Sequence, residues 1–187
     1  ALPESRKEFI IEDAHVKCTI DLSVMDTFNV HKYPSNPFQV TFNPLDAFYC
    51  IYTSGSTGFP KGCRINHQNM LNYLNWIGQY WKGNEEKKVG YFTTLSFDFT
   101  ITSVLGSLLS GSCLSIINDD AELSESLNQL ISDNGVSVIK LTPAHIGLLS
   151  KESLQKSSPK VFIVGGEALS KKQIEYLRNN NGCLIYN

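Results

Sequence analysis

Small, hydroxylated and glycine residues gather between Thr53 and Lys61, in the stretch YTSGSTGFPKG, directly after a run of apolar residues. Glycines at the end of a strand let backbone N–H groups turn toward an anion, and the hydroxyl groups and the lysine add further donors. Such a loop is suited to holding a polyphosphate. It is not a Walker motif, because Pro60 precedes the lysine and no serine or threonine follows it. The composition alone leaves a flexible turn with a solvated lysine equally open.

A few other side chains are candidates for binding or catalysis. Asp98 opens an expected helix, so it could cap that helix or face a ligand. Glu167 follows two glycines and fits either a turn-stabilising role or a role in ordering a nucleotide site. We interpret His67 and His145, which lie at the starts of expected helices, as structural residues. The spacing of cysteines and histidines predicts no metal site.

The composition is that of an ordinary globular protein. Of 187 residues, 42% are hydrophobic and 18% are charged, and the formal net charge is -2. The absence of a basic stripe argues against nucleic acid and membrane surfaces as partners, and the charged N-terminal residues are unlike a signal peptide. Three of the five cysteines, Cys18, Cys50 and Cys113, lie in apolar runs. This pattern favours buried thiols in a cytoplasmic protein over disulfides.

Apolar runs and helix signals predict the elements that position these residues. Helices are expected at 3–14, 66–81, 98–109, from 119 or 120 to 135, after 143, and at 170–179. Strands are expected at 16–20, 47–52, 89–94, 113–117, 136–141, 160–164 and from 183, and residues 22–45 are expected to be irregular.

Strands that alternate with helices predict an α/β fold with a mostly parallel sheet flanked by helices. The strand at 47–52 lacks polar alternation, which predicts burial on both faces. The uncharged run from Phe99 to Asn118 is long enough to cross a bilayer. Its many hydroxyl residues, and the SGS at 110–112, instead favour a buried helix followed by a buried strand.

Read as a whole, YTSGSTGFPKG closely resembles the phosphate loop of the adenylate-forming enzymes, the superfamily of acyl-CoA synthetases, luciferases and peptide-synthetase adenylation domains. The stretches LPESRKEFIIEDAHVKCTI, INHQNMLN and GGEAL are similar to other parts of that family, so the resemblance covers essentially the whole chain. LSFDFTITSVLGSLLSG resembles the segment by which amino-acid-activating domains of nonribosomal peptide synthetases hold their substrate.

The resemblance implies a two-step reaction of a larger enzyme. ATP, with Mg2+, and an amino acid would form an aminoacyl adenylate, and the acyl group would then move to the phosphopantetheine thiol of a carrier protein. Residues 1–187 would be a partial adenylation-domain core, the AMP-binding region within a large N-terminal part of the domain. The family's magnesium-binding stretch, ribose-binding aspartate, hinge and C-terminal subdomain are expected outside these residues, so the chain alone is expected to be inactive.

The resemblance also implies three sets of binding residues. The phosphate-binding set is Thr53, Ser54, Gly55, Ser56, Thr57, Gly58 and Lys61. The amino-acid-binding set is Asp98, Phe99, Thr102, Lys140, Ile163 and Gly165. The adenine-binding set is Gly166, Glu167 and Asn187.

Within these sets, the resemblance places the α-ammonium group of the substrate at Asp98. Lys140 is unusual, because a buried ammonium needs a partner, and a short carboxylate or carboxamide side chain on the substrate would supply one. Together with the resemblance, this predicts aspartate or asparagine as substrate. The alternatives are that Lys140 reaches solvent, that the chain is part of an acyl-CoA or aryl-acid ligase, or that it is a noncatalytic nucleotide-binding remnant.

Overall fold

The computed structural model describes residues 3–36, 39–54, 59–81, 88–117, 122–133, 135–156, 159 and 161–187. The chain divides into two compact units, residues 1–70 and residues 71–187. The boundary falls within helix α3 (His67–Ile77). Each unit is described by itself.

The first unit is built on an antiparallel hairpin of β1 (Ala47–Ser54) and β2 (Pro60–Asn66). Two helices and a short 3-10 turn precede it: α1 (Glu4–Asp13), α2 (Leu22–Thr27) and η1 (Val30–Lys32). Tyr52 on β1 donates a hydrogen bond of 2.5 Å to Asp13 at the end of α1. This contact ties the first helix to the hairpin.

Three expectations for the first unit are wrong. Residues 16–20 form no strand, because this short apolar run pairs with no neighbouring strand. The expected irregular segment contains α2, whose N-cap Asp21 accepts a hydrogen bond from the backbone N–H of Val24. β1 is largely exposed and pairs with β2 alone, so it is not a doubly covered strand of the parallel sheet.

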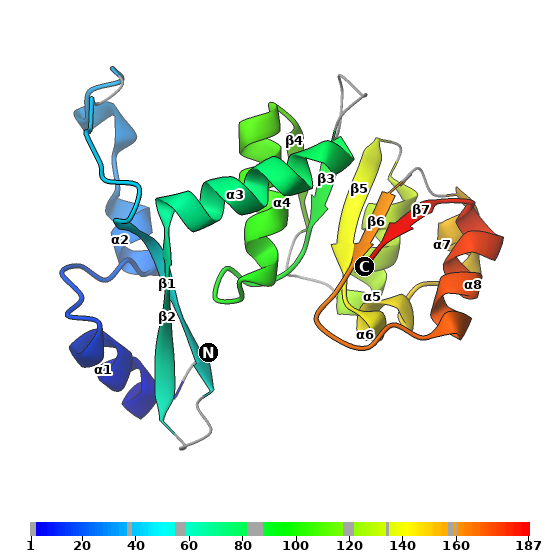
Figure 1. The fold of residues 1–187 in the computed structure, drawn as a ribbon, viewed down its shortest axis with the longest axis horizontal. Coiled ribbons are helices and arrows are strands. Elements are labelled where there is room, and N and C mark those ends of the chain that lie inside the picture. Colours follow the sequence, from blue (N-terminus) through cyan, green and yellow to red (C-terminus); the bar gives the residue numbers. More distant parts are fainter. Residues whose placement is uncertain are drawn as a thin grey trace. The chain divides into compact units, whose positions relative to one another are not determined.

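The second unit is a parallel five-stranded sheet in the order β4-β3-β5-β6-β7 (Figure 1). Its strands are β3 (Lys88–Tyr91), β4 (Cys113–Ile116), β5 (Val136–Leu141), β6 (Val161–Val164) and β7 (Leu184–Tyr186). The helical elements are the continuation of α3, η2 (Gly78–Trp81), α4 (Phe99–Ser110), α5 (Leu123–Ser132), α6 (Pro143–Ile146), α7 (Lys151–Lys156) and α8 (Lys171–Asn181). Strands and helices alternate along this unit, as the sequence predicts.

Alternation along β5 gives the sheet two different faces. Ile139 and Leu141 point into the main apolar core, where they join Phe162 and the buried residues of α5, α7 and α8. Lys140, between them, points to the opposite face, where α4 packs. The first face is closed by aliphatic packing, whereas the second places a lysine beside a helix rich in hydroxyl residues.

Local signals fix the start of α3 and both ends of α8. Ser170 caps α8 through a capping box with Gln173, and Gly182 ends the helix in the left-handed conformation with φ of 67°. Asn66 accepts a hydrogen bond of 2.7 Å from the N–H of Asn69, as expected for the cap of α3. Asp119 and Asp120, the expected caps of α5, lie outside the described residues. Helix α7 was not predicted.

The prediction of thiols rather than disulfides is confirmed, but the predicted burial of three of them is wrong. Cys18, Cys50 and Cys113 are exposed, and the buried cysteine is Cys183. All five cysteines are free thiols in the structure. Among the described residues, none of the helices has the length and apolar character of a membrane span. The run from Phe99 folds into a helix and a strand as predicted, but the expected burial of the strand is wrong, because Cys113 and Ile116 at the ends of β4 are exposed.

Candidate functional site

Parallel strands bring several predicted residues to one edge of the sheet. β5, β6 and β7 are neighbours, and their carboxyl ends lead into Thr142, Gly165 and Asn187 respectively. The N–H of Gly165 donates a hydrogen bond of 3.1 Å to the carbonyl of Leu141, which holds the two strand ends together. In open parallel sheets, ligands bind outside the carboxyl ends of the strands.

Lys140 forms the centre of a polar cluster on the α4 face. Its Nζ donates a hydrogen bond of 2.6 Å to Thr102 Oγ1 and lies 4.1 Å from the centre of the Phe99 ring. The Thr102 hydroxyl, which is fully buried, also bonds the phenolic oxygen of Tyr73. Residues from α3, α4 and β5 thus meet around one ammonium group.

Burial controls the charge of this cluster. Desolvation lowers the pKa of Lys140 to about 8, and the charge of Asp98 acts in the opposite direction. Burial also raises the pKa of Tyr73. An ammonium group gains from a cation–π contact with Phe99, yet only one of its three N–H groups is used by Thr102. The remaining donors are suited to a ligand that brings oxygen acceptors.

Asp98 occupies the N-cap position of α4 without acting as a cap. Its backbone is helical, with φ of -59° and ψ of -24°, and its side chain makes no capping hydrogen bond. The residue is exposed, while the next residue, Phe99, is buried and stacks on Phe97 with ring centres 5.5 Å apart. Helix capping therefore does not account for Asp98, and its carboxylate is available to a cation.

The two glycines after β6 keep the backbone close to Phe99. Gly166 has a φ of +87°, a left-handed conformation in which a side chain is strained. A Cβ at this position would lie 3.6 Å from Thr142, and one at Gly165 would lie 3.9 Å from Phe99. Gly165 follows Ile163 by two residues, and Ile163 is the register partner of Lys140. The structure therefore places Ile163 and Gly165 next to the strand that carries Lys140.

Glu167 and His145 brace the turn after β5. Glu167 Oε2 accepts a hydrogen bond of 3.2 Å from the N–H of Ala144. His145 forms a capping box with Thr142, and its ring meets Phe92 edge-on with centres 5.0 Å apart. Burial lowers the pKa of His145, which Glu167 partly opposes. The structural interpretation of His145 is confirmed by these contacts, and Glu167 has a contact that stabilises the turn.

The glycine- and hydroxyl-rich loop connects β1 and β2 of the first unit. Thr53 pairs with Lys61 and Ser54 with Pro60 in the hairpin register, and Thr53, Ser54 and Lys61 are exposed. Gly55, Ser56, Thr57 and Gly58 lie outside the described residues. The sequence predicts no strand between this loop and the next helix, but in the structure β2 lies between the loop and α3. His67 stacks on Phe42 with ring centres 4.4 Å apart, which confirms its structural role.

Tyr73 is the residue of the cluster that the sequence did not single out. It lies on the same helix face as Met70, Leu74 and Ile77, where its hydroxyl gives no signal of a polar contact. Its contact with Thr102 joins residues 29 positions apart. Among the described residues, no group of three or more His, Cys, Asp or Glu side chains could hold a metal ion.

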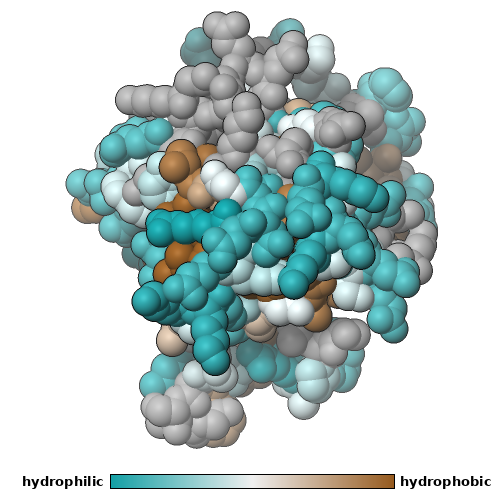
Figure 2. All heavy atoms as spheres, turned by 90° about the vertical axis from the view of Figure 1, so that its right-hand side faces the viewer, coloured by the Kyte–Doolittle hydropathy of each residue, from teal (hydrophilic) through white to brown (hydrophobic). Residues whose placement is uncertain are grey.

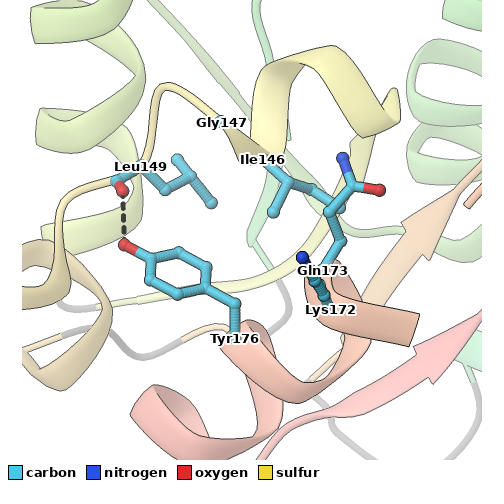
Figure 3. Close-up of a pocket in the computed structure, with 6 residues that line it drawn as sticks. All are labelled: Ile146, Gly147, Leu149, Lys172, Gln173 and Tyr176. Atoms are coloured by element: carbon cyan, nitrogen blue, oxygen red, sulfur yellow. Dashed lines mark hydrogen bonds between the residues drawn. The ribbon is translucent and has the colours of Figure 1, made fainter. Parts of the chain in front are cut away.

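A separate open pocket of about 450 Å³ lies between α6, the following turn and α8 (Figure 3). It is lined by Ile146, Gly147, Leu149, Lys172, Gln173 and Tyr176, and shares no residue with the Lys140 cluster. Tyr176 donates a hydrogen bond of 2.7 Å to the carbonyl of Leu149, which fixes one wall (Figure 3). Figure 2, which faces the α8 side of the second unit, shows a mostly hydrophilic surface.

The second unit is thus an α/β fold with a parallel sheet, and its candidate residues lie around the carboxyl ends of the strands. Residues 1–187 match the family of AMP-binding enzymes. The chain belongs to this family, which confirms the resemblance and the fold class that the sequence predicts.

Individual relatives show the same relationship. Tyrocidine synthase 3 of Brevibacillus parabrevis is 33% identical over 185 residues, which are 97% of this chain and 3% of that protein. The D-alanine--D-alanyl carrier protein ligase of Lactococcus lactis subsp. lactis (strain IL1403) is 32% identical over 167 residues, which are 84% of this chain and 33% of the ligase. This chain therefore spans a third or less of either relative.

A crystal structure of the nonribosomal peptide synthetase FmoA3 has the same fold. The match has a TM-score of 0.82 at 18% sequence identity, and it covers 99% of this chain and 22% of the FmoA3 chain.

Proposed function

We propose that residues 1–187 are the central part of the N-terminal core of an amino-acid-activating domain in a longer protein. The observation that carries this proposal is the position of Asp98. Its exposed carboxylate makes no capping hydrogen bond, and it directly precedes α4, the helix that contacts Lys140. In this proposal the Asp98 carboxylate binds the α-ammonium group of an amino acid, and the Lys140 ammonium group binds a polar side chain of the same amino acid. The substrate of an acyl-CoA or aryl-acid ligase would have no ammonium group for Asp98 to bind.

The proposed reaction begins with attack by a carboxylate oxygen of the amino acid on the α-phosphorus of ATP. A new O–P bond forms, the bond from the α-phosphorus to the bridging oxygen breaks, and pyrophosphate leaves with the electron pair. In the second step a carrier-protein thiol gives its proton to water and attacks the acyl carbon. A C–S bond forms, the bond from the acyl carbon to the phosphate oxygen breaks, and AMP leaves with the electron pair. The carrier as partner is supported by the relationship to the D-alanine--D-alanyl carrier protein ligase.

In this proposal, Thr53, Ser54 and Lys61, with residues 55–58, hold the β- and γ-phosphates. Hydroxyl and ammonium donors at the ends of the β1–β2 hairpin favour this role, because stabilisation of the leaving pyrophosphate depends on positioned donors. Mg2+ would neutralise the phosphate charge through ligands outside residues 1–187.

We assign the base of the nucleotide to the backbone of Gly166, to Glu167 and to Asn187. The left-handed turn at Gly166 presents main chain without a side chain, which suits contact with a flat ring. Asn187 follows the carboxyl end of β7, and it is exposed. An amide there can read a base edge, since it offers both a donor and an acceptor.

The proposed substrate is aspartate or asparagine. Lys140 offers hydrogen-bond donors beside Phe99, the buried Thr102 hydroxyl holds it there, and Gly165 leaves room next to that ring. A carboxylate or carboxamide oxygen would satisfy the two N–H groups of Lys140 that Thr102 does not use. A large apolar side chain would desolvate this ammonium group without giving it a further partner, which is unfavourable.

The test is amino-acid-dependent exchange of pyrophosphate into ATP, measured with the full-length protein across all common amino acids. We expect aspartate or asparagine to support exchange well ahead of leucine and phenylalanine. Benzoate and acetate, added with coenzyme A, serve as the ligase controls. Exchange only with those acids would replace the proposal by an aryl- or acyl-activating function, and ATP binding without any exchange would favour a noncatalytic role.

A further inference from the structure

The hydroxyl of Tyr73 is bonded to the hydroxyl of Thr102. Tyr73 lies in the part of α3 that belongs to the second unit, on a helix face that is otherwise apolar. Thr102 is fully buried in α4 and cannot bond water. Its oxygen contacts Tyr73 on one side and Lys140 on the other. The three residues form a continuous chain of hydrogen bonds.

The number of hydrogens on the three groups limits how this series of hydrogen bonds can be arranged. Lys140 can only donate, so Thr102 Oγ1 must accept from it. Thr102 and Tyr73 each carry one hydroxyl hydrogen, and one of the two lies between their oxygens. If Thr102 donates to Tyr73, its lone pairs stay free for Lys140, and bonds aligned in this way strengthen one another. Without Tyr73, the buried Thr102 hydrogen loses this acceptor.

The second hydroxyl hydrogen of the pair has no acceptor in the described part of the chain. A polar hydrogen left unpaired in a mostly buried place is unfavourable. Together with the two N–H groups of Lys140 that Thr102 does not use, this hydrogen makes the donors of the cluster outnumber the acceptors that the described residues offer. An oxygen-rich side chain of a ligand would supply the missing acceptors, whereas an apolar one would not.

We propose that Tyr73 is a positioning residue for amino-acid selection, which fixes the Thr102 hydroxyl and, through it, the place of the Lys140 ammonium group over Phe99. This inference rests on the proposed function and names a residue of the same site. The predicted effect of Tyr73 is on discrimination between side chains, because the contact leads to Lys140. We expect Tyr73 to have no effect on KM for ATP.

The test is a double-mutant cycle of Tyr73→Phe and Thr102→Val in the full-length protein, with kcat/KM of pyrophosphate exchange measured for aspartate, asparagine and leucine. Each variant removes one hydroxyl and keeps the shape of the side chain. We expect Tyr73→Phe to lower the ratio of the preferred amino acid to leucine by roughly three- to tenfold, the loss of about one neutral hydrogen bond. The change should appear in KM for the amino acid, with KM for ATP unchanged.

The cycle should be strongly non-additive. In the Thr102→Val background, Tyr73→Phe should have little further effect, because the contact through which it acts is already lost. Thr102→Ser, which keeps the hydroxyl, should retain most of the selectivity. A merely structural role of Tyr73 would reduce the amount of active enzyme, and the ratio between two amino acids does not depend on that amount.

Tyr176→Phe is the matched control, since it removes a tyrosine hydroxyl that bonds the carbonyl of Leu149 in the same unit. It should leave the selectivity ratio unchanged. A second measurement does not require activity: the pH dependence of Lys140 methylation by formaldehyde and borohydride, followed by mass spectrometry. Tyr73→Phe should shift this titration to lower pH, because a weaker Thr102 contact stabilises the ammonium form less.

The outcomes separate the two proposals. If the unmodified protein activates no amino acid, the proposed function is wrong, whatever Tyr73 does to the titration of Lys140. If the unmodified protein prefers aspartate or asparagine but Tyr73→Phe changes neither the ratio nor the titration, this inference alone is wrong. Equal effects of Tyr73→Phe with and without the Thr102 hydroxyl would also overturn it.

Discussion

Lys140 Nζ is hydrogen-bonded to Thr102 Oγ1 at 2.6 Å, across the interface between the sheet and α4. The ammonium group also lies 4.1 Å from the centre of the Phe99 ring, so it makes two contacts within the protein, whereas a snorkelling lysine would direct this group to water. A positive group is therefore held beside the predicted amino-acid site by two contacts.

The first prediction concerns Lys140→Met, which keeps the length of the side chain and removes the charge. A hydrogen bond to a charged group contributes about 1.5–3 kcal/mol, so we expect kcat/KM for aspartate or asparagine to fall roughly 10- to 150-fold. The value for leucine should stay constant or rise. Pyrophosphate exchange with each amino acid measures both.

Lys171→Met is the control for this change, because Lys171 is 89% exposed on α8. It should leave the order of substrates intact. If Lys140→Met also leaves the order intact, Lys140 has no part in selecting the side chain.

The second prediction concerns pH. Desolvation lowers the pKa of Lys140 to about 8, so the free protein loses the ammonium charge as pH rises through that value. The preference for aspartate over leucine, taken as a ratio of kcat/KM values, should therefore decrease between pH 7 and pH 9. Both substrates carry the same α-ammonium group, so its own titration cancels to first order in the ratio. In Lys140→Met the ratio should be independent of pH.

How far the sequence predicts the fold depends on whether the signals are local. The helices and strands from β3 to β7, apart from α7, follow from apolar runs with caps and glycines beside them, such as Ser170 and Gly182 around α8. β2 has no such signal, because PKGCRIN contains few apolar residues and becomes a strand by pairing with β1. Residues 16–20 have the opposite property, a strand-like run without a partner.

In the candidate site, too, residues with a local signal could be predicted and contacts between distant residues could not. Asp98 and Lys140 could be found from motif and charge, since a carboxylate at a helix start and a lysine in an apolar strand are visible in the sequence. The contact of Tyr73 with Thr102 could not, because it depends on how α3 packs on α4. Periodicity identifies the apolar face on which Tyr73 lies but not the polar atom that it meets.

The third prediction distinguishes the two roles that the sequence leaves open for Asp98. If Asp98 binds the α-ammonium group, Asp98→Asn should lower kcat/KM roughly 10- to 150-fold for every amino acid, with little change in their order. The melting temperature should change little, because the carboxylate makes no capping hydrogen bond. A capping role predicts the reverse, a loss of about 1 kcal/mol of stability with catalysis retained. Thermal unfolding and exchange assays on the same preparation separate these results.

The last prediction concerns the phosphate loop. Lys61 is exposed on β2 opposite Thr53, so Lys61→Ala should leave the fold unchanged. If its ammonium group contacts a phosphate, the loss of that charge-assisted bond should lower kcat/KM for ATP roughly 10- to 150-fold. Selectivity among amino acids should be unaffected, because the change acts on the nucleotide. Lys32→Ala, at an exposed lysine of the same unit, is the control for a general effect of charge. Equal ATP kinetics in the two variants would remove Lys61 from the phosphate site and leave it a solvated lysine of the hairpin.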